Sequence, residues 1–101
     1  MKELSFTSFL KTYIEDFIAH KNALGFPFEQ SARHLLSFDK MCCERFADHT
    51  CLDSEIALAW AERKPDEHPN TLIRRISPIR GLAEYMSRRG TTAYVIPKGL
   101  P

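Results

Sequence analysis

Apolar residues recur every three or four positions along the first part of the chain. They are Phe6, Phe9, Leu10, Tyr13, Ile14, Phe17 and Ile18. Because an α-helix makes one turn in about 3.6 residues, this spacing places an apolar stripe along one helical face. We predict a first helix from about Ser5 to Leu24, ended by Gly25, since glycine readily adopts the backbone that closes a helix.

Two further helices are expected in the next part of the chain. Pro27 opens the second, whose buried face holds Phe28, Ala32, Leu35, Cys42 and Phe46. Its polar face carries Gln30, Arg33, His34, Ser37, Lys40 and Met41. A short third helix, from Ser54 to about Arg63 with Asp53 as its N-cap, buries Ile56, Ala59 and Trp60. The following KPDEHPN, with its two prolines, is a turn.

Residues 70–90 carry the clearest helical pattern, and we expect them to form the fourth helix. Asn70 is the predicted N-cap, and Gly90 supplies the closing residue behind Arg88 and Arg89. The apolar stripe consists of Leu72, Ile76, Ile79, Ala83 and Met86. Opposite it lie Asn70, Arg74, Ser77 and Gly81, while Arg75 and Arg80 flank the apolar arc on its two sides.

Pro78 interrupts this helical pattern, because proline lacks the amide that an interior position needs. One interpretation is a kink that wraps the helix around the core. The other is that the kink, together with Gly81 one turn later, fits the outer face of the helix to the surface of a partner.

The elements predict an all-α protein, a four-helix bundle with a short third helix. After Gly90 the sequence TTAYVIPKGLP has two prolines and no helical repeat, so we expect an extended linker that does not pack. Residues 1–90 would then form one domain, and residues 91–101 would lead away from it.

Length and composition agree with a single folded domain. The 101 residues contain 44% hydrophobic residues, which argues against disorder. No apolar run approaches the roughly 20 residues that span a membrane, and the N-terminus carries acids where a signal peptide would be apolar. These features predict a soluble, cytoplasmic protein without a membrane partner.

The net charge of +1 conceals an uneven distribution. Residues 70–101 contain six basic residues and one acidic residue, whereas residues 1–69 carry an excess of four acids. A basic helix in a nearly neutral protein suggests a local anionic partner, of which the phosphate backbone of nucleic acid is the commonest. The alternative is a solvated helix that pairs with acidic helices of its own fold.

Three cysteines, Cys42, Cys43 and Cys51, suit a reducing compartment and do not form a disulfide framework. Together with His49 they resemble a metal-ligand set, but the usual paired C-x-x-C spacing is missing. Adjacent cysteines on a helix also point about 100° apart. We therefore interpret them as buried free thiols and expect no cofactor or metal.

The sequence contains no constellation that could catalyse a reaction. It has no G-x-S-x-G, no phosphate-binding glycine loop and no H-E-x-x-H. We predict that this chain, taken alone, is not an enzyme.

Four segments resemble the core-binding domain of tyrosine recombinases, the phage-integrase superfamily. RRISPIRGLAEYM is similar to the R-x-L-S-x-L-R-x-F-x-x-Y-L signature in the last helix of that domain. HKNALGFPFEQSARHLLSFDKMC resembles its opening, DSEIALAWAERKP its short third helix, and AYVIPKGLP the linker to the catalytic domain.

The resemblance implies a four-helix, SAM-like domain that clamps one face of double-stranded DNA during recombination or integration. In that family a second domain supplies the tyrosine nucleophile, an arginine pair, a lysine and an H-x-x-R motif. No H-x-x-R occurs here, so the expected partners are DNA, the catalytic domain of the same parent chain and a recombinase tetramer on DNA.

By the same analogy the second and fourth helices face the major groove. The implied DNA-binding residues are Arg33, Ser37, Lys40, Arg74, Arg75, Ser77 and Arg80. Arg74 is the strongest candidate because it lies opposite the apolar stripe. Arg75 has two interpretations that the sequence leaves equal: contact with DNA, or pairing with an acid of another helix.

The acids Glu29, Asp39 and Glu44 on the second helix weaken it as a DNA-binding face. Three alternatives therefore stay open. The chain could be a helical protein-interaction module, a stand-alone helix-turn-helix regulator, or a switch that binds metal through its cysteines.

Overall fold

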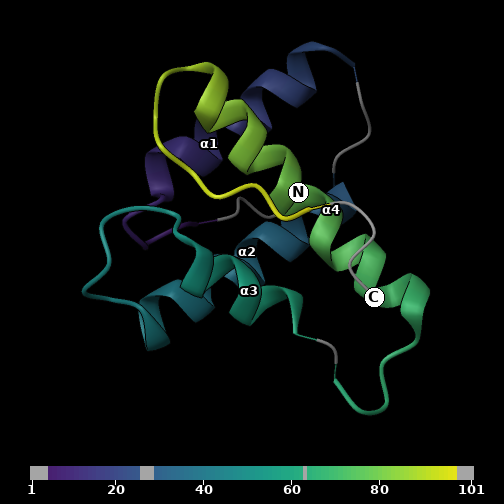
Figure 1. The fold of residues 1–101 in the computed structure, drawn as a ribbon. Helices are drawn as coiled ribbons and strands as arrows, with labels where there is room; N and C mark the ends of the chain where they lie inside the picture. The colour runs from purple at the N-terminus through teal and green to yellow at the C-terminus, as the bar shows by residue number, and fades with distance from the viewer. Residues whose placement is uncertain (1–4, 26–28, 63, 98–101) are drawn as a thin grey trace.

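The computed structural model describes residues 5–25, 29–62 and 64–97, and these ranges fold into four helices (Figure 1). The helices are α1 (Lys11–Ala23), α2 (Glu29–Arg45), α3 (Ser54–Ala61) and α4 (Pro69–Arg88). Within the described ranges there is no β-strand, only an isolated parallel bridge between Leu52 and Ala93. The prediction of an all-α fold with a short third helix is confirmed.

Helix α4 is the central element, because it packs against each of the other three helices and most extensively against α2. Its buried stripe contains all five residues expected from the sequence, and the core continues with Leu82 and Pro78. Trp60 is a core residue, as predicted, and its ring meets that of Phe38 edge to face with centroids 5.4 Å apart. Burial of this shared core is the main source of the fold's stability.

The first helix begins six residues later than predicted, at Lys11 rather than Ser5. The preceding residues instead run across α2, where the Asp39 carboxylate accepts hydrogen bonds from the amides of Thr7 and Ser8, both at 3.0 Å. The Ser8 hydroxyl then accepts a bond from the Leu10 amide at 3.1 Å. The Leu10 and Lys11 amides thus bond to Ser8 instead of to carbonyls four residues earlier, and regular helical pairing begins with the bond from the Ile14 amide to the Leu10 carbonyl.

Asp39 therefore does not belong to the polar face of α2. Its side chain is buried with 1% exposure, facing the N-terminal segment rather than solvent. The start of α2 at Pro27 and the burial of Phe28 lie outside the described residues, and from Glu29 onward the helix is regular.

Helix α3 begins as the sequence predicts, with the Asp53 carboxylate accepting a hydrogen bond from the Ile56 amide at 3.0 Å. It ends at Ala61, because Glu62 has an extended backbone, while Arg63 lies outside the described residues. Ala59, which was predicted to be buried, is only half-buried. Ala57, which was not among the predicted core residues, is buried instead.

The N-cap of α4 is His68, and the prediction of Asn70 is wrong. The His68 Nδ1 atom accepts a hydrogen bond from the Asn70 amide at 3.1 Å, and Pro69 occupies the first helical position. Proline's fixed φ is already helical, and its missing amide costs nothing at that position, so the helix begins one residue before Asn70.

The C-terminal end of α4 confirms the role predicted for Gly90. Its φ is +85°, a backbone conformation that glycine adopts without steric cost. The Gly90 amide donates to the Ser87 carbonyl at 3.1 Å and the Thr91 amide to the Met86 carbonyl at 2.9 Å. These two bonds form a Schellman motif, which satisfies carbonyls at the helix end.

Gly81 faces α1 and not a partner. A Cβ at this position would lie 3.1 Å from Cζ of Phe17, which is tighter than ordinary packing contacts. The missing side chain of Gly81 thus admits the Phe17 ring of the same chain. The interpretation that Gly81 fits the outer face of α4 to another molecule is wrong, although Pro78 does lie inside the helix and is buried.

The segment after Gly90 packs against the helices, contrary to the prediction of an unpacked linker. The Tyr94 amide donates to the Leu52 carbonyl at 2.8 Å, and Ile96 is only 1% exposed. An apolar side chain that reaches the core stabilises an extended segment without any helical repeat. This correction applies to residues 91–97, while residues 98–101 lie outside the described part of the chain.

The loop between α2 and α3 contains a titratable pair. The ring of His49 lies with Nδ1 2.7 Å from Oδ2 of Asp53. The hydrogen bond with Asp53 raises the pKa of His49, and the nearby Glu55 carboxylate adds to it. Although burial opposes the change, the Ile56 amide and His49 lower the pKa of Asp53.

The raised pKa of His49 makes the stability of the fold depend on pH. Because the folded pKa of His49 is raised above 6.5, the pair contributes stability below pH 6.5 and loses it as pH rises through the folded value. We expect His49→Gln to lower the melting temperature at pH 5.5 and to have a smaller effect at pH 8.5. Melting curves followed by circular dichroism at both pH values test this, and an equal loss at both would contradict it.

Candidate nucleic-acid interface

Five of the seven residues predicted to contact DNA lie at the surface. Arg33, Ser37 and Lys40 of α2 are exposed, as are Arg74 and Ser77 of α4. Spacings of three and four residues place each group on one face of its helix. Within the described ranges, none of these five side chains forms a hydrogen bond or an ion pair. They are therefore available to an external partner.

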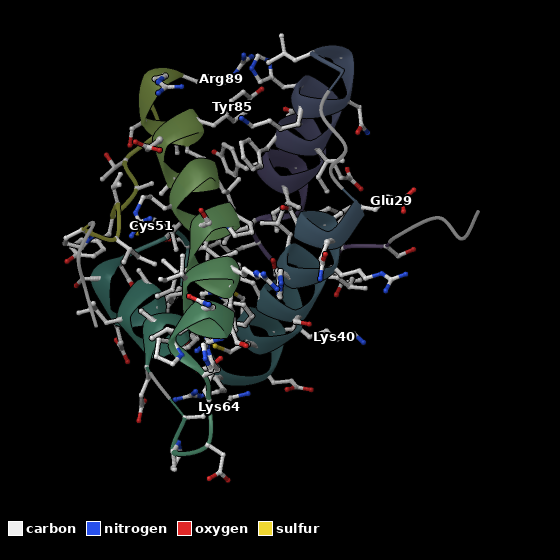
Figure 2. All side chains as sticks on the ribbon, turned by 90° about the vertical axis from the view of Figure 1, so that its right-hand side faces the viewer. Glu29, Lys40, Cys51, Lys64, Tyr85 and Arg89 are labelled. Atoms are coloured by element: carbon white, nitrogen blue, oxygen red, sulfur yellow. The ribbon has the colours of Figure 1, made fainter. Side chains whose placement is uncertain are left out.

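The two helices that carry these residues lie against each other, as Figure 2 shows with α4 in front and α2 beside it. Lys40 projects from α2 into solvent in this view. Since Asp39 is buried, the acids left on the surface of α2 are Glu29 and Glu44, against the three basic residues Arg33, Lys40 and Arg45. The exposed surface of α2 is thus more basic than its sequence suggests.

Arg75 lies inside the fold and pairs with an acid, which is the second of its two interpretations. Its Nε and Nη2 atoms donate to the two carboxylate oxygens of Glu67 at 2.9 and 2.8 Å, a bidentate arrangement. Nη1 donates to the Trp60 carbonyl, and Nη2 also donates to the Glu62 carbonyl at 3.1 Å. The acid comes from the turn before α4 rather than from another helix.

The backbone and aromatic ring of α3 complete this arrangement. The Trp60 Nε1 atom donates to the Arg75 carbonyl at 2.8 Å, and the guanidinium lies 5.0 Å from the centroid of the Trp60 ring. The hydrogen bonds from Arg75 lower the pKa of Glu67 from 4.5 to about 2. Arg75 consequently joins α3, α4 and the intervening turn, and its donors are used within the chain.

Arg80 is half-buried and also has partners within the chain. Its Nε atom donates to the Ile96 carbonyl at 2.8 Å and its Nη2 atom to the Pro97 carbonyl at 3.1 Å. The three arginines of α4 that were predicted to contact DNA therefore differ: Arg74 is exposed, whereas Arg75 and Arg80 bond to other parts of the protein.

A cleft of about 360 Å³ opens between α2, α3 and the N-terminal half of α4. Its lining includes Ser37 of the candidate face, and Arg45 and Lys64, which the sequence analysis did not select. Burial, and then the positive charge of Arg75, lowers the pKa of His34 in this cleft. Arg45 lies on the polar side of α2, and this position could have identified it from the sequence as a further candidate for DNA binding.

The cysteines do not form a metal-ligand cluster within the described residues, where no three His, Cys, Asp or Glu side chains are placed to hold an ion. Burial, followed by the nearby Asp39 carboxylate, raises the pKa of the Cys42 thiol to about 12. The prediction of buried thiols holds for Cys42 only: Cys43 is half-buried, with its Sγ 3.2 Å from the Thr7 hydroxyl, and Cys51 is exposed. A thiol with so high a pKa stays protonated and is a poor nucleophile or metal ligand.

In the described part of the chain, no helix combines the length and the apolar character that crossing a membrane requires.

Comparison with known proteins gives one informative relative. The chain is 26% identical over 87 residues to a Sinorhizobium fredii protein named "Putative integrase/recombinase y4rB". The similarity covers 86% of this chain but only 27% of the relative. No protein-family model matches the chain, and no solved structure matches it significantly. The chain is thus similar, over most of its length, to a minor part of an integrase-like protein.

Proposed function

We propose that this chain is the DNA-binding domain of a site-specific tyrosine recombinase, in which it clamps recombination-site DNA. The observation that carries the proposal is the exposed, unpaired set of polar and basic side chains on two adjoining helices, α2 and α4. The similarity to a protein named as an integrase or recombinase supports the same assignment. The four-helix architecture is consistent with the SAM-like domain that the sequence resemblance implies.

The proposed interface consists of Arg33, Ser37, Lys40, Arg74 and Ser77. Arg75 and Arg80 are left out, because their guanidinium groups bond within the protein. Lysine and arginine contacts to phosphate position a protein on DNA without reading sequence, whereas an arginine can read guanine through two hydrogen bonds. We propose Arg74 for either task, and its exposure and lack of a partner among the described residues support this choice.

The relative is nearly four times as long as the region that matches. We therefore propose that further domains belong to the same recombinase. In the proposal, cleavage and rejoining of DNA belong to a catalytic domain of the same parent chain, which would meet the other face of the duplex. Assembly of four such proteins on DNA is part of the proposal. This domain contributes binding and orientation, and it performs no chemistry itself.

Fluorescence anisotropy with a short duplex, measured across a salt series, tests the proposal. We expect binding to weaken linearly with the logarithm of salt concentration, because neutralised phosphates release counterions. Arg74→Ala should reduce the salt slope by about 1, as expected when one phosphate contact is lost. Lys11→Ala is the matched control, because it removes one exposed positive charge from α1, a helix that contributes no residue to the proposed interface.

Two results would contradict the proposal. One is the absence of binding at low salt and high protein concentration. The other is an identical change in salt slope for Arg74→Ala and Lys11→Ala, which would indicate diffuse attraction rather than an interface on α2 and α4.

A second candidate function, a helical protein-interaction module, is favoured by apolar side chains at the surface. Leu24, Leu58 and Ile73 are 57%, 46% and 59% exposed, and Ile73 is adjacent to Arg74 on α4. Exposed apolar side chains are common singly but also mark protein contacts. Sedimentation velocity separates the two functions: self-association that is insensitive to salt and is lost in Ile73→Ser would favour the interaction module.

A further inference from the structure

Residues 91–97, which we call the C-terminal strap, are built into the domain. The Schellman motif at Gly90 turns the chain at the end of α4, and the strap runs back beside that helix (Figure 1). The Tyr94 amide bonds to the Leu52 carbonyl, and the buried Ile96 side chain enters the core. The chain therefore reaches Pro97 at the middle of α4 and not beyond its end.

Arg80 fixes the last part of this strap. One edge of its guanidinium donates to two consecutive carbonyls, those of Ile96 and Pro97, at 2.8 and 3.1 Å. The rigid fork of an arginine matches two acceptors at once, which a lysine ammonium on a flexible stem does not. Because carbonyls of an extended segment otherwise turn to water, these two bonds hold the strap in one place.

The position of this contact relates the strap to the proposed interface. Arg80 follows Ser77 by three residues on α4, so the two positions are separated by about 4.5 Å along the helix axis. Arg74 lies about 9 Å along the same axis. The Pro97 carbonyl is therefore held by a side chain that starts less than one helical turn from Ser77 of the proposed interface.

We propose that Arg80 is a positioning residue: it anchors the C-terminal strap to α4 and so fixes where the chain reaches Pro97, next to the part of α4 that carries Ser77. Its anchoring role follows from the contacts alone, whereas the link between that position and DNA binding rests on the proposed function. Arg74 and Arg80 thus divide two tasks, Arg74 contacting phosphate and Arg80 setting the path of the chain.

Residue-resolved amide exchange, followed by NMR on the whole chain, tests the anchor. In Arg80→Ala the Tyr94 amide should exchange roughly ten- to a hundredfold faster, because a charge-assisted contact no longer holds the strap closed. The Thr91 amide is an internal control, since it bonds to Met86 within the helix cap and should keep its rate. Arg74→Ala is the matched control and should leave the Tyr94 amide unchanged.

Arg80→Lys keeps the proposal testable if Arg80→Ala loosens the whole domain. It retains the charge and much of the stem but loses the two-carbonyl fork, so Tyr94 should again exchange faster while helix amides do not. Unchanged exchange at Tyr94 in both Arg80 variants would overturn the anchor.

The salt series for DNA binding separates this inference from the proposed function. Arg80→Ala should keep the wild-type salt slope, and a slope reduced by about 1 would make Arg80 a phosphate contact and overturn the division of tasks. Wild-type protein that fails to bind DNA would refute the proposed function. The exchange comparison would still decide whether Arg80 anchors the strap.

Discussion

Replacing Arg75 with alanine should destabilise the protein by about 3 kcal/mol, a larger loss than we expect from any other arginine of α4. The substitution removes the bidentate partner of Glu67 and the donor to the Trp60 carbonyl. Glu67 then loses the guanidinium that binds both of its carboxylate oxygens, and a largely buried charge with fewer partners is costly. For a domain of this size the melting temperature should fall by roughly 12–24 °C.

The matched control for this change is Arg74→Ala, because the two arginines are adjacent on α4 and differ in burial. Arg74 is exposed, so its removal should change stability by no more than about 0.5 kcal/mol. Urea denaturation followed by circular dichroism measures both variants. Equal stability of the two would show that the Arg75 network contributes nothing to the fold.

The same ion pair predicts how stability changes in acid. Because the folded pKa of Glu67 is about 2, below its ordinary 4.5, the pair stabilises the fold above pH 4.5. This contribution is lost progressively as pH falls from 4.5 toward 2. We therefore expect the difference between wild type and Arg75→Ala to shrink over that range, and a difference that stays constant would contradict the assignment.

Asp39→Ala should cost about 2–3 kcal/mol, since two amide donors lose their acceptor at once. The buried carboxylate bonds to both Thr7 and Ser8, and these bonds place the N-terminal segment across α2. Without them the segment that leads into α1 should detach, and the amides of both residues should exchange faster with solvent.

Glu44→Ala provides the control for Asp39→Ala, because it removes the same charge from an exposed position of the same helix. Thermal denaturation of both variants gives the comparison. If Asp39→Ala were as mild as Glu44→Ala, the carboxylate would be a surface acid and the exposed face of α2 would be correspondingly less basic.

The sequence determined the features that depend on neighbours a few residues away. The apolar stripe of α4, the Asp53 cap of α3 and the closing role of Gly90 were all predicted correctly. The cap and the closing glycine depend on contacts within about one helical turn, and the stripe follows from a three-to-four-residue periodicity, so the local order of residues is enough to predict them. The number of helices and the all-α class follow from the same local periodicity.

Some local predictions failed where two local signals competed. Asn70 and His68 can both accept an amide at a helix start, and the intervening Pro69 settled the choice in favour of His68. Similarly, proline-containing sequence after Gly90 suggested an unpacked linker, but Ile96 found a place in the core. Periodicity does not reveal the burial of one apolar side chain in an extended segment.

Which charged residues remain available to a partner depends on how the helices pack. Arg74 and Arg75 are adjacent and chemically identical, yet Arg75 meets Glu67 eight residues away and Arg74 stays exposed. Asp39 turns inward to amides more than 30 residues distant, and Arg80 reaches carbonyls 16 and 17 residues along the chain. Such choices depend on which groups the packed helices bring together, because a charged side chain is buried only where tertiary contacts supply its partners.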